Sequence, residues 1–222
     1  MNIQEIINQQ LAADQEKLKT RERSGKYSPS MLGRCYRAQF WNRLNEPITN
    51  PPDERSLRVL KAGGIFHWWV QRIVLENNPQ IHKEVLVEDD DFKGFADLVN
   101  TDEVVDIKTM HSKGFWYLEK AKDIKKEKYE AWLQVMFYTL KLGKIYGKLC
   151  FVSKDDLTMS EYRQPIEGYW LNELGKETAT LREIWVRKQL PPCQPRAYNG
   201  KECKYCNWRD KCQKGEQSAD SK

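Results

Sequence analysis

The chain has no long uninterrupted run of apolar residues. Its first twenty residues, MNIQEIINQQLAADQEKLKT, mix apolar with polar and charged side chains, so neither a signal peptide nor a membrane-spanning segment is expected there. No internal repeat is visible. Because neither a signal peptide nor a membrane-spanning segment is expected, we predict a soluble, cytoplasmic protein with no membrane partner.

The chain also lacks a large excess of charge of one sign. It has 37 Lys and Arg against 32 Asp and Glu, which gives a formal net charge of +5. An excess of this size permits a polyanionic partner but does not require one. Aromatic faces beside basic side chains suit single-stranded nucleic acid, and the sequence has 8 Trp and 10 Tyr, although most of these rings are expected in the core.

The order of predicted elements indicates an α/β domain. A chain of 222 residues can bury a full core, and one domain with at most a small appendage is expected. Apolar periodicity and helix-start signals predict helices near 2–22, 31–44, 53–77, 127–142 and 168–189. Short β-rich runs predict strands at 81–88, 93–99, 103–109, 144–153 and 159–163. This order predicts a mixed sheet behind a helical N-terminal portion.

Two details of this organisation are specific enough to check. The third helix should bury one apolar face, made by Leu57, Leu60, Ile65, Trp68 and Ile73. The segment after Pro191-Pro192 is too rich in Cys, Pro and Gly for regular structure, and its last ten or so residues read as a disordered tail.

The six cysteines are more easily explained by metal binding than by disulfides. In a reducing compartment, thiols are usually metal ligands or free. Three of them, Cys203, Cys206 and Cys212, lie within ten residues in an irregular basic segment, which predicts a metal-binding loop. Cys35, which follows a helix start in PSMLGRC, is the best candidate for a fourth ligand, and Cys193 is the rival closer in sequence.

Zinc and an iron–sulfur cluster could each be held by four thiolates. Zinc sites more often pair two Cys-x2-Cys units, and this segment has one, so the spacing fits a cluster better without settling the choice. A site that joins Cys35 to Cys203 would tie distant parts of the chain together and act mainly as structure. Cys150, within the predicted strand KLCFVS, is expected to be a buried small apolar residue.

Two acidic residues interrupt apolar strands that are neighbours in the chain. Asp97 ends the run GFAD, and Asp106 and Lys108 share one face of the next strand because side chains alternate with a period of two. Asp-x-Lys alone usually marks a solvated strand face. Two carboxylates within apolar strands are costly to bury unpaired, so together they favour a site for Mg²⁺ or Mn²⁺. Lys108 would then reach the attacking water or the scissile phosphate.

Four further polar residues have a structural and a functional interpretation. His67 in GGIFHWW is either a hydrogen-bonded core histidine or a third metal ligand. Glu84 is either an additional carboxylate for that metal or an ordinary surface residue, and the sequence does not favour one over the other. Gln134 and Tyr138 are four residues apart and project from one helical face. They either form the polar edge of the apolar face of that helix or bind a phosphate or nucleobase.

In this order, the motifs resemble the CRISPR-associated RecB-like iron–sulfur exonucleases of the PD-(D/E)xK nuclease superfamily. PSMLGRC, GGIFHWW, GFAD, VVDIKT, QVMFY and CKYCNWRDKC follow one another over about residues 28–212. Each motif is weak alone, and the six in order are highly specific. Many relatives have Glu where this chain has Asp106, and the pattern accepts either acid.

The resemblance implies a fold, two cofactors and a set of site residues. It implies a restriction-endonuclease-like mixed central sheet flanked by helices, with an N-terminal helix (1–27), a nuclease domain (28–190), a cysteine segment that packs with Cys35 (191–212) and a tail (213–222). The implied roles are metal ligation by His67, Asp97, Asp106 and the Ile107 carbonyl, catalysis by Lys108, DNA placement by Gln134 and Tyr138, and a 4Fe–4S cluster on Cys35, Cys203, Cys206 and Cys212.

The expected activity is divalent-metal-dependent hydrolysis of DNA, with single-stranded ends as substrate. The resemblance further implies trimming of spacer precursors for CRISPR adaptation, with the CRISPR integrase complex as a partner. A stand-alone or phage recombination or repair nuclease would have the same residues. Two other hypotheses are a non-catalytic DNA-binding iron–sulfur module and an interaction protein whose fold is held together by zinc.

Overall fold

The computed structural model describes residues 1–19 and 24–217, and its centre is a five-stranded mixed sheet. The strands lie in the order β1-β2-β3-β4-β5, with the bounds His82–Glu88, Lys93–Val99, Glu103–Met110, Tyr146–Ser153 and Met159–Pro165. The β3–β4 pair is parallel and the other three pairs are antiparallel. The expected mixed sheet is confirmed, including the fifth strand.

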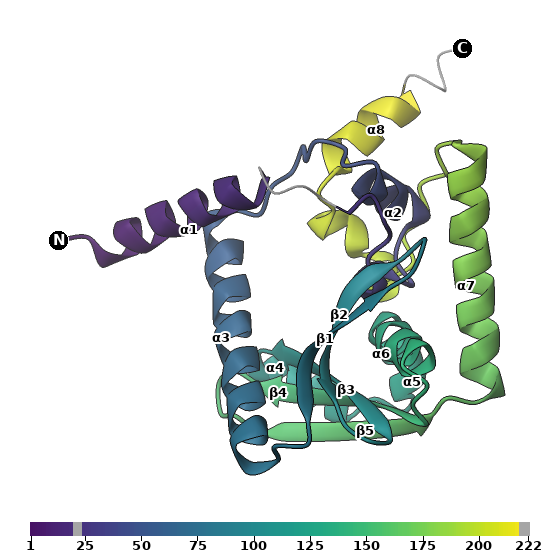
Figure 1. Ribbon diagram of the computed structural model, residues 1–222. Coiled ribbons are helices and arrows are strands. Elements are labelled where there is room, and N and C mark those ends of the chain that lie inside the picture. Colours follow the sequence, from purple (N-terminus) through teal and green to yellow (C-terminus); the bar gives the residue numbers. More distant parts are fainter. Residues whose placement is uncertain (20–23, 218–222) are drawn as a thin grey trace.

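Helices surround this sheet and precede it, as Figure 1 shows. The α-helices are α1 (Ile3–Lys19), α2 (Tyr36–Arg43), α3 (Glu54–Asn77), α4 (Ser112–Glu119), α5 (Ile124–Glu127), α6 (Tyr129–Lys141), α7 (Gly168–Arg187) and α8 (Arg209–Gln217). Short 3-10 turns are η1 (Pro29–Met31), η2 (Tyr198–Gly200) and η3 (Glu202–Tyr205). No described helix combines the length and apolar character that crossing a membrane requires.

The sheet separates two apolar cores. The larger one joins α6 and α7 to the sheet through residues such as Trp132, Phe137 and Leu181. The smaller one lies under α3, where Val70 packs with Leu98, Ile107, Cys150 and Val152. Figure 1 shows α3 and α6 on opposite sides of the sheet. The expected burial of Cys150 is confirmed.

The predicted apolar face of α3 is wrong. Leu57 is buried, but Leu60 and Trp68 are 61% and 52% exposed, and Ile65 and Ile73 are exposed as well. The helix instead faces the sheet through Gly63, whose missing Cβ lets it approach Thr109, and through Val70 and Gln71. Periodicity located the helix correctly but selected the wrong side, because small and polar residues occupy the packed side.

Several boundaries also differ from the sequence-based prediction. The second helix begins at Tyr36 instead of near Met31, since Gly33 adopts a left-handed φ of 77° between the 3-10 turn and the helix. Helices α4 and α5 fill a stretch for which no element was expected. The cysteine-rich end is not wholly irregular: α8 covers 209–217 and so includes the first half of the expected tail, while residues 218–222 and 20–23 lie outside the described residues.

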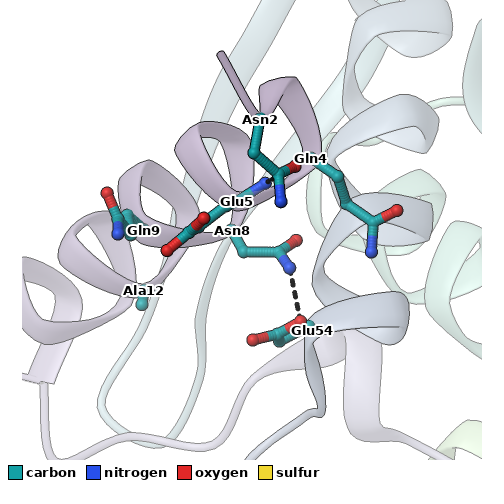
Figure 2. A pocket seen from close by; sticks show the side chains of 7 residues that line it. All are labelled: Asn2, Gln4, Glu5, Asn8, Gln9, Ala12 and Glu54. Carbon is teal, nitrogen blue, oxygen red and sulfur yellow. Dashed lines mark hydrogen bonds between the residues drawn. The ribbon is translucent and has the colours of Figure 1, made fainter.

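Helix α1 projects away from the sheet and packs against α3 (Figure 1). Between the two helices lies a polar hollow of about 440 Å³, shown in Figure 2, where the Asn8 side chain donates a hydrogen bond to Glu54. The lining consists of amides, two acids and one alanine and contains none of the predicted site residues. The candidate chemistry therefore lies elsewhere, at the sheet.

Candidate functional site

The site begins where β2 and β3 separate. These strands pair only at Leu98–Val105 and Val99–Val104, and the same register carried one step further would place Asp97 opposite Asp106. Two carboxylates therefore meet at the point where the backbone ladder ends. The Asp97 side chain replaces the missing ladder bond, because its Oδ2 accepts from the Ile107 N–H at 2.7 Å.

Asp106 and Lys108 share one face of β3, as strand alternation predicted. The Lys108 Nζ donates to Asp106 Oδ1 at 3.0 Å and to Gln134 Oε1 on α6 at 2.9 Å. It also lies 2.8 Å from Asp106 Oδ2, but not in hydrogen-bonding geometry. Asp106 is only 1% exposed, so its Oδ2 is a buried oxygen to which no described residue donates.

His67 approaches Asp97 from α3. Its Nδ1 lies 3.8 Å from Asp97 Oδ2, and its Nε2 lies 3.6 Å from Glu84 Oε1 on β1. One ligand atom each from His67, Glu84 and Asp97 fall within 4.8 Å of one another. The core-histidine interpretation of His67 therefore does not describe its surroundings.

Burial and neighbouring charge act together on Asp97. Burial raises the pKa of the Asp97 carboxyl to about 8, and the negative charge of Asp106 acts in the same direction. The Ile107 N–H and the Lys108 ammonium oppose this rise without cancelling it. Such crowding of carboxylates in a sheltered place is typical of a functional site.

Tyr138 lies beneath the site and not on its surface. It is almost completely buried, and a Cβ on Gly94 would fall 2.4 Å from its hydroxyl oxygen, so the ring fits only because residue 94 is glycine. Burial raises the pKa of Tyr138, and the charges of Asp106 and Asp97 add to that effect. A phenol in this position packs against β2, and its expected role in DNA placement stays a prediction.

The donor set fits a divalent cation. Carboxylate oxygens with an imidazole suit Mg²⁺ or Mn²⁺, and the buried Asp106 Oδ2, which pairs with the Lys108 ammonium but accepts no hydrogen bond from a described residue, is a further oxygen that such an ion would use. The N–H and C=O of one strand residue face the same neighbour. Because the Ile107 N–H turns toward Asp97, its carbonyl faces the same gap between β2 and β3.

A second cluster lies at the other end of the molecule and consists of cysteines. The Cys35 N–H donates to both carboxylate oxygens of Glu202, at 3.0 and 3.2 Å, which brings Cys35 beside Cys203. Cys206 and Cys212 pack around the buried Trp208, which lies against Trp41 with ring centroids 6.2 Å apart. The four cysteines predicted from the sequence are thus brought together.

Cys193 belongs to the same neighbourhood. It packs in the apolar cluster of Cys212 and Cys206, and the pKa of its thiol is raised by burial and then by a hydrogen bond with Cys212. Arg37 donates to the Cys212 sulfur at 3.2 Å. The thiols of this neighbourhood are donors that suit an iron–sulfur cluster or zinc. Either would need four of them, and five are present: Cys35, Cys193, Cys203, Cys206 and Cys212.

Two organising residues were not found from the sequence. Gln71 is buried four residues after His67 and donates to both Glu84 and the Asp97 carbonyl. Glu202 holds Cys35 and the Arg196 N–H. The spacing of Gln71 from His67 was a usable signal, because residues four apart share a helical face.

Comparison with solved structures identifies the fold. The crystal structure of SSO0001 matches with a TM-score of 0.60 and 20% identity, covering 96% of this chain and 96% of that chain. The alkaline exonuclease LHK-Exo from Laribacter hongkongensis, in complex with dAMP, matches with a TM-score of 0.51 and 14% identity over 74% of this chain and 89% of that chain. A phage-related exonuclease from Haemophilus somnus 129PT gives 0.53 and 10% over 69% and 80%.

No protein-family model matches the chain, and no curated protein matches it. At identities of 10–20%, the structural likeness establishes the fold alone. The chain therefore has a mixed α/β fold that it shares with known exonucleases, and the expected fold class is confirmed.

Proposed function

We propose that this protein is a divalent-metal-dependent DNA exonuclease. The observation that carries the proposal is the meeting of Asp97, Asp106, Lys108 and His67 where β2 and β3 separate. The fold supports it, because two of the similar solved structures are exonucleases and one of these is bound to dAMP.

The cation would be held by His67, Asp97, Asp106 and the Ile107 carbonyl. When bound, it supplies Lewis-acid stabilisation to the charge of a phosphodiester and lowers the pKa of water nearby. Lys108 supplies the other positive charge. Its ammonium donates to Asp106 and Gln134, and because a third of the side chain is exposed, a phosphate oxygen or the attacking water can approach it.

Single-stranded ends are the substrate that the surroundings favour. Trp68 and Trp69 directly follow His67 on α3, and Phe95 lies two residues before Asp97 on the same strand. All three rings are exposed, at 37% or more. Exposed aromatic rings stack on unpaired bases without regard to sequence, so these three rings, which are close to site residues in the sequence, support a single-stranded substrate.

For the cysteine cluster we propose a 4Fe–4S cluster held by Cys35, Cys203, Cys206 and Cys212. Its role would be structural, because these residues connect α2 to the C-terminal segment. Zinc is the alternative, and metal analysis of anaerobically purified protein separates the two.

Two biological settings fit this activity. The motif order resembles CRISPR-associated exonucleases and implies trimming of spacer precursors together with an integrase complex. The structural likeness to a phage-related exonuclease favours a recombination nuclease without that partner. Co-purification with integrase proteins and trimming of spacer precursors by the resulting complex would support the first setting.

The proposed activity can be tested by cleavage of end-labelled single- and double-stranded DNA with Mn²⁺, Mg²⁺ or EDTA. Wild type should degrade DNA from an end only with a metal ion, and Lys108→Ala should lower the rate by about a hundredfold or more. Lys176→Ala, an exposed lysine on α7, is the matched control and should cleave like wild type.

Folded wild-type protein that binds DNA but does not cleave it with either metal would overturn the proposal. The protein would then be a DNA-binding module that keeps the nuclease fold.

A further inference from the structure

Glu84 has an unusual backbone for a strand residue. Its φ is +49°, and among the described non-glycine residues with positive φ it is the one that lies within a β-strand. Pairing of β1 with β2 is regular on both sides of it, at Lys83–Leu98 and Val85–Ala96, but Glu84 and Asp97 stand opposite each other without a ladder pair. Residues with a Cβ rarely adopt this conformation unless the surroundings hold them there.

Gln71 provides that hold. Its Nε2 donates to Glu84 Oε1 at 2.8 Å and to the Asp97 carbonyl oxygen at 3.0 Å. The side chain comes from α3, is 4% exposed, and therefore fixes both strands from a position with little freedom to move. Its second bond occupies the Asp97 carbonyl at the position where the β1–β2 ladder is interrupted.

The result is a third carboxylate directed at the site. Glu84 Oε1 lies 3.6 Å from His67 Nε2, and a ligand atom of each residue falls within 4.8 Å of the other and of Asp97. The buried Asp106 Oδ2 accepts no hydrogen bond from a described residue and has the Lys108 ammonium 2.8 Å away, which is a second sign that positive charge belongs here. The site then contains three carboxylates, of Glu84, Asp97 and Asp106, and the ammonium of Lys108, an imbalance of charge that a divalent cation corrects.

We propose that Glu84 is an additional ligand to the cation of this site, and that Gln71 is the positioning residue that directs its carboxylate. This inference rests on the proposed metal-dependent function. It adds a ligand from β1 that the motifs of the sequence do not require. The half-exposed Glu84 side chain also leaves the cation open to substrate on that side.

The test is Mn²⁺ binding, measured by titration calorimetry and by the electron paramagnetic resonance signal of free Mn²⁺. Glu84→Gln should weaken Mn²⁺ binding by at least the roughly tenfold to hundredfold that loss of a partner outside the ligand shell costs. Glu88→Gln removes a carboxylate from the same strand, where Glu88 pairs with Lys26 and Lys93, and should leave Mn²⁺ affinity unchanged.

Gln71 is tested through its dependence on Glu84. Gln71→Leu should weaken Mn²⁺ binding by about threefold to tenfold in the wild-type background and have no further effect beside Glu84→Gln. An equal effect in both backgrounds would show that Gln71 only supports the fold. Thermal unfolding of each variant verifies that it is folded.

The outcomes separate the inference from the proposed function. If Glu84→Gln binds Mn²⁺ as tightly as wild type while Asp106→Asn does not, the role of Glu84 is overturned and the metal-dependent nuclease stands. If wild type binds no Mn²⁺, both are overturned.

Discussion

At the scale of single residues, the placement of Lys108 decides the chemistry. Its ammonium is fixed by Asp106 on the same strand and by Gln134 on α6, and a third of the side chain remains exposed. Gln134 is itself buried and accepts a hydrogen bond from Lys108. This contact adds a positioning role for Gln134, in which it directs the lysine, and its expected role in DNA placement stays a prediction.

Replacement of Gln134 should therefore reduce catalysis without removing it. Gln134→Leu keeps the volume but removes the acceptor, so Lys108 loses one of two fixed contacts and its single-turnover cleavage rate should fall by about tenfold to a hundredfold. The same substitution beside Lys108→Ala should change the residual rate little. Comparable losses in both backgrounds would contradict the role and point to a direct contact with DNA.

The residues of the site differ in how far the sequence could identify them. Asp106 and Lys108 were predictable because alternation along a strand is strict, and Asp97 because it interrupts an apolar run. Gln71 has no such mark. Its importance comes from two hydrogen bonds to other elements, and these exist only after α3 is placed on the sheet.

At the scale of elements, α3 shows where periodicity fails. An apolar stripe normally marks the side of a helix that packs. Here the packed side contains Gly63, His67 and Gln71, because the site lies between the helix and the sheet. The side chains of the candidate site occupy the packed side of α3. Four of its large apolar residues face outward instead, namely Leu60, Ile65, Trp68 and Ile73. The existence and length of the helix were nevertheless predicted closely, since these depend on local signals such as the Asp53 cap.

The turn between β1 and β2 is held to two helices by one carboxylate. Asp91 accepts from Arg43 of α2 at 3.1 Å and from Arg182 of α7 at 2.7 Å. The Arg43 guanidinium lies over the rings of Tyr27 and Trp185, at 4.5 and 4.0 Å from their centroids. Burial favours the protonated form of Asp91, but the two guanidinium hydrogen bonds outweigh it and lower the pKa of this carboxyl.

Asp91→Asn should consequently destabilise the protein at neutral pH by about 2 kcal/mol. A lowered pKa means that the folded state favours the charged carboxylate. The contribution is therefore complete above the ordinary Asp pKa and is lost as the pH falls through the lowered one. Urea unfolding at pH 7 and near pH 3 measures this: the difference from wild type should shrink at low pH. Asp90→Asn, at the exposed neighbouring position, is the control, and a pH-independent difference for Asp91→Asn would contradict the ion-pair explanation.

At the scale of the whole molecule, the cysteine cluster connects parts of the chain that are far apart in sequence. Cys35 precedes α2, whereas Cys203, Cys206 and Cys212 follow the last strand and α7. Glu202 and Trp208 complete the connection, since Glu202 holds the Cys35 N–H and the Trp208 indole donates to the Glu46 carbonyl at 3.2 Å. The sequence left the fourth ligand open between Cys35 and Cys193, and the structure places both near the other three thiols, so position alone does not choose between them.

The last prediction concerns which thiols hold the cluster. Cys35→Ser should lose the visible absorbance and bound iron of the anaerobically purified protein. Without a ligand that joins α2 to the C-terminal segment, its stability should fall by about 3 kcal/mol, or roughly 6–12 °C in melting temperature. Cys193→Ser should keep the iron, because four thiols remain, and Cys150→Ser in the buried strand β4 controls for loss of a thiol in general. The opposite result, with iron lost from Cys193→Ser and retained in Cys35→Ser, would make Cys193 the fourth ligand. The cluster would then bind within the C-terminal segment, and that segment would be joined to α2 by protein contacts such as those of Glu202 and Arg37.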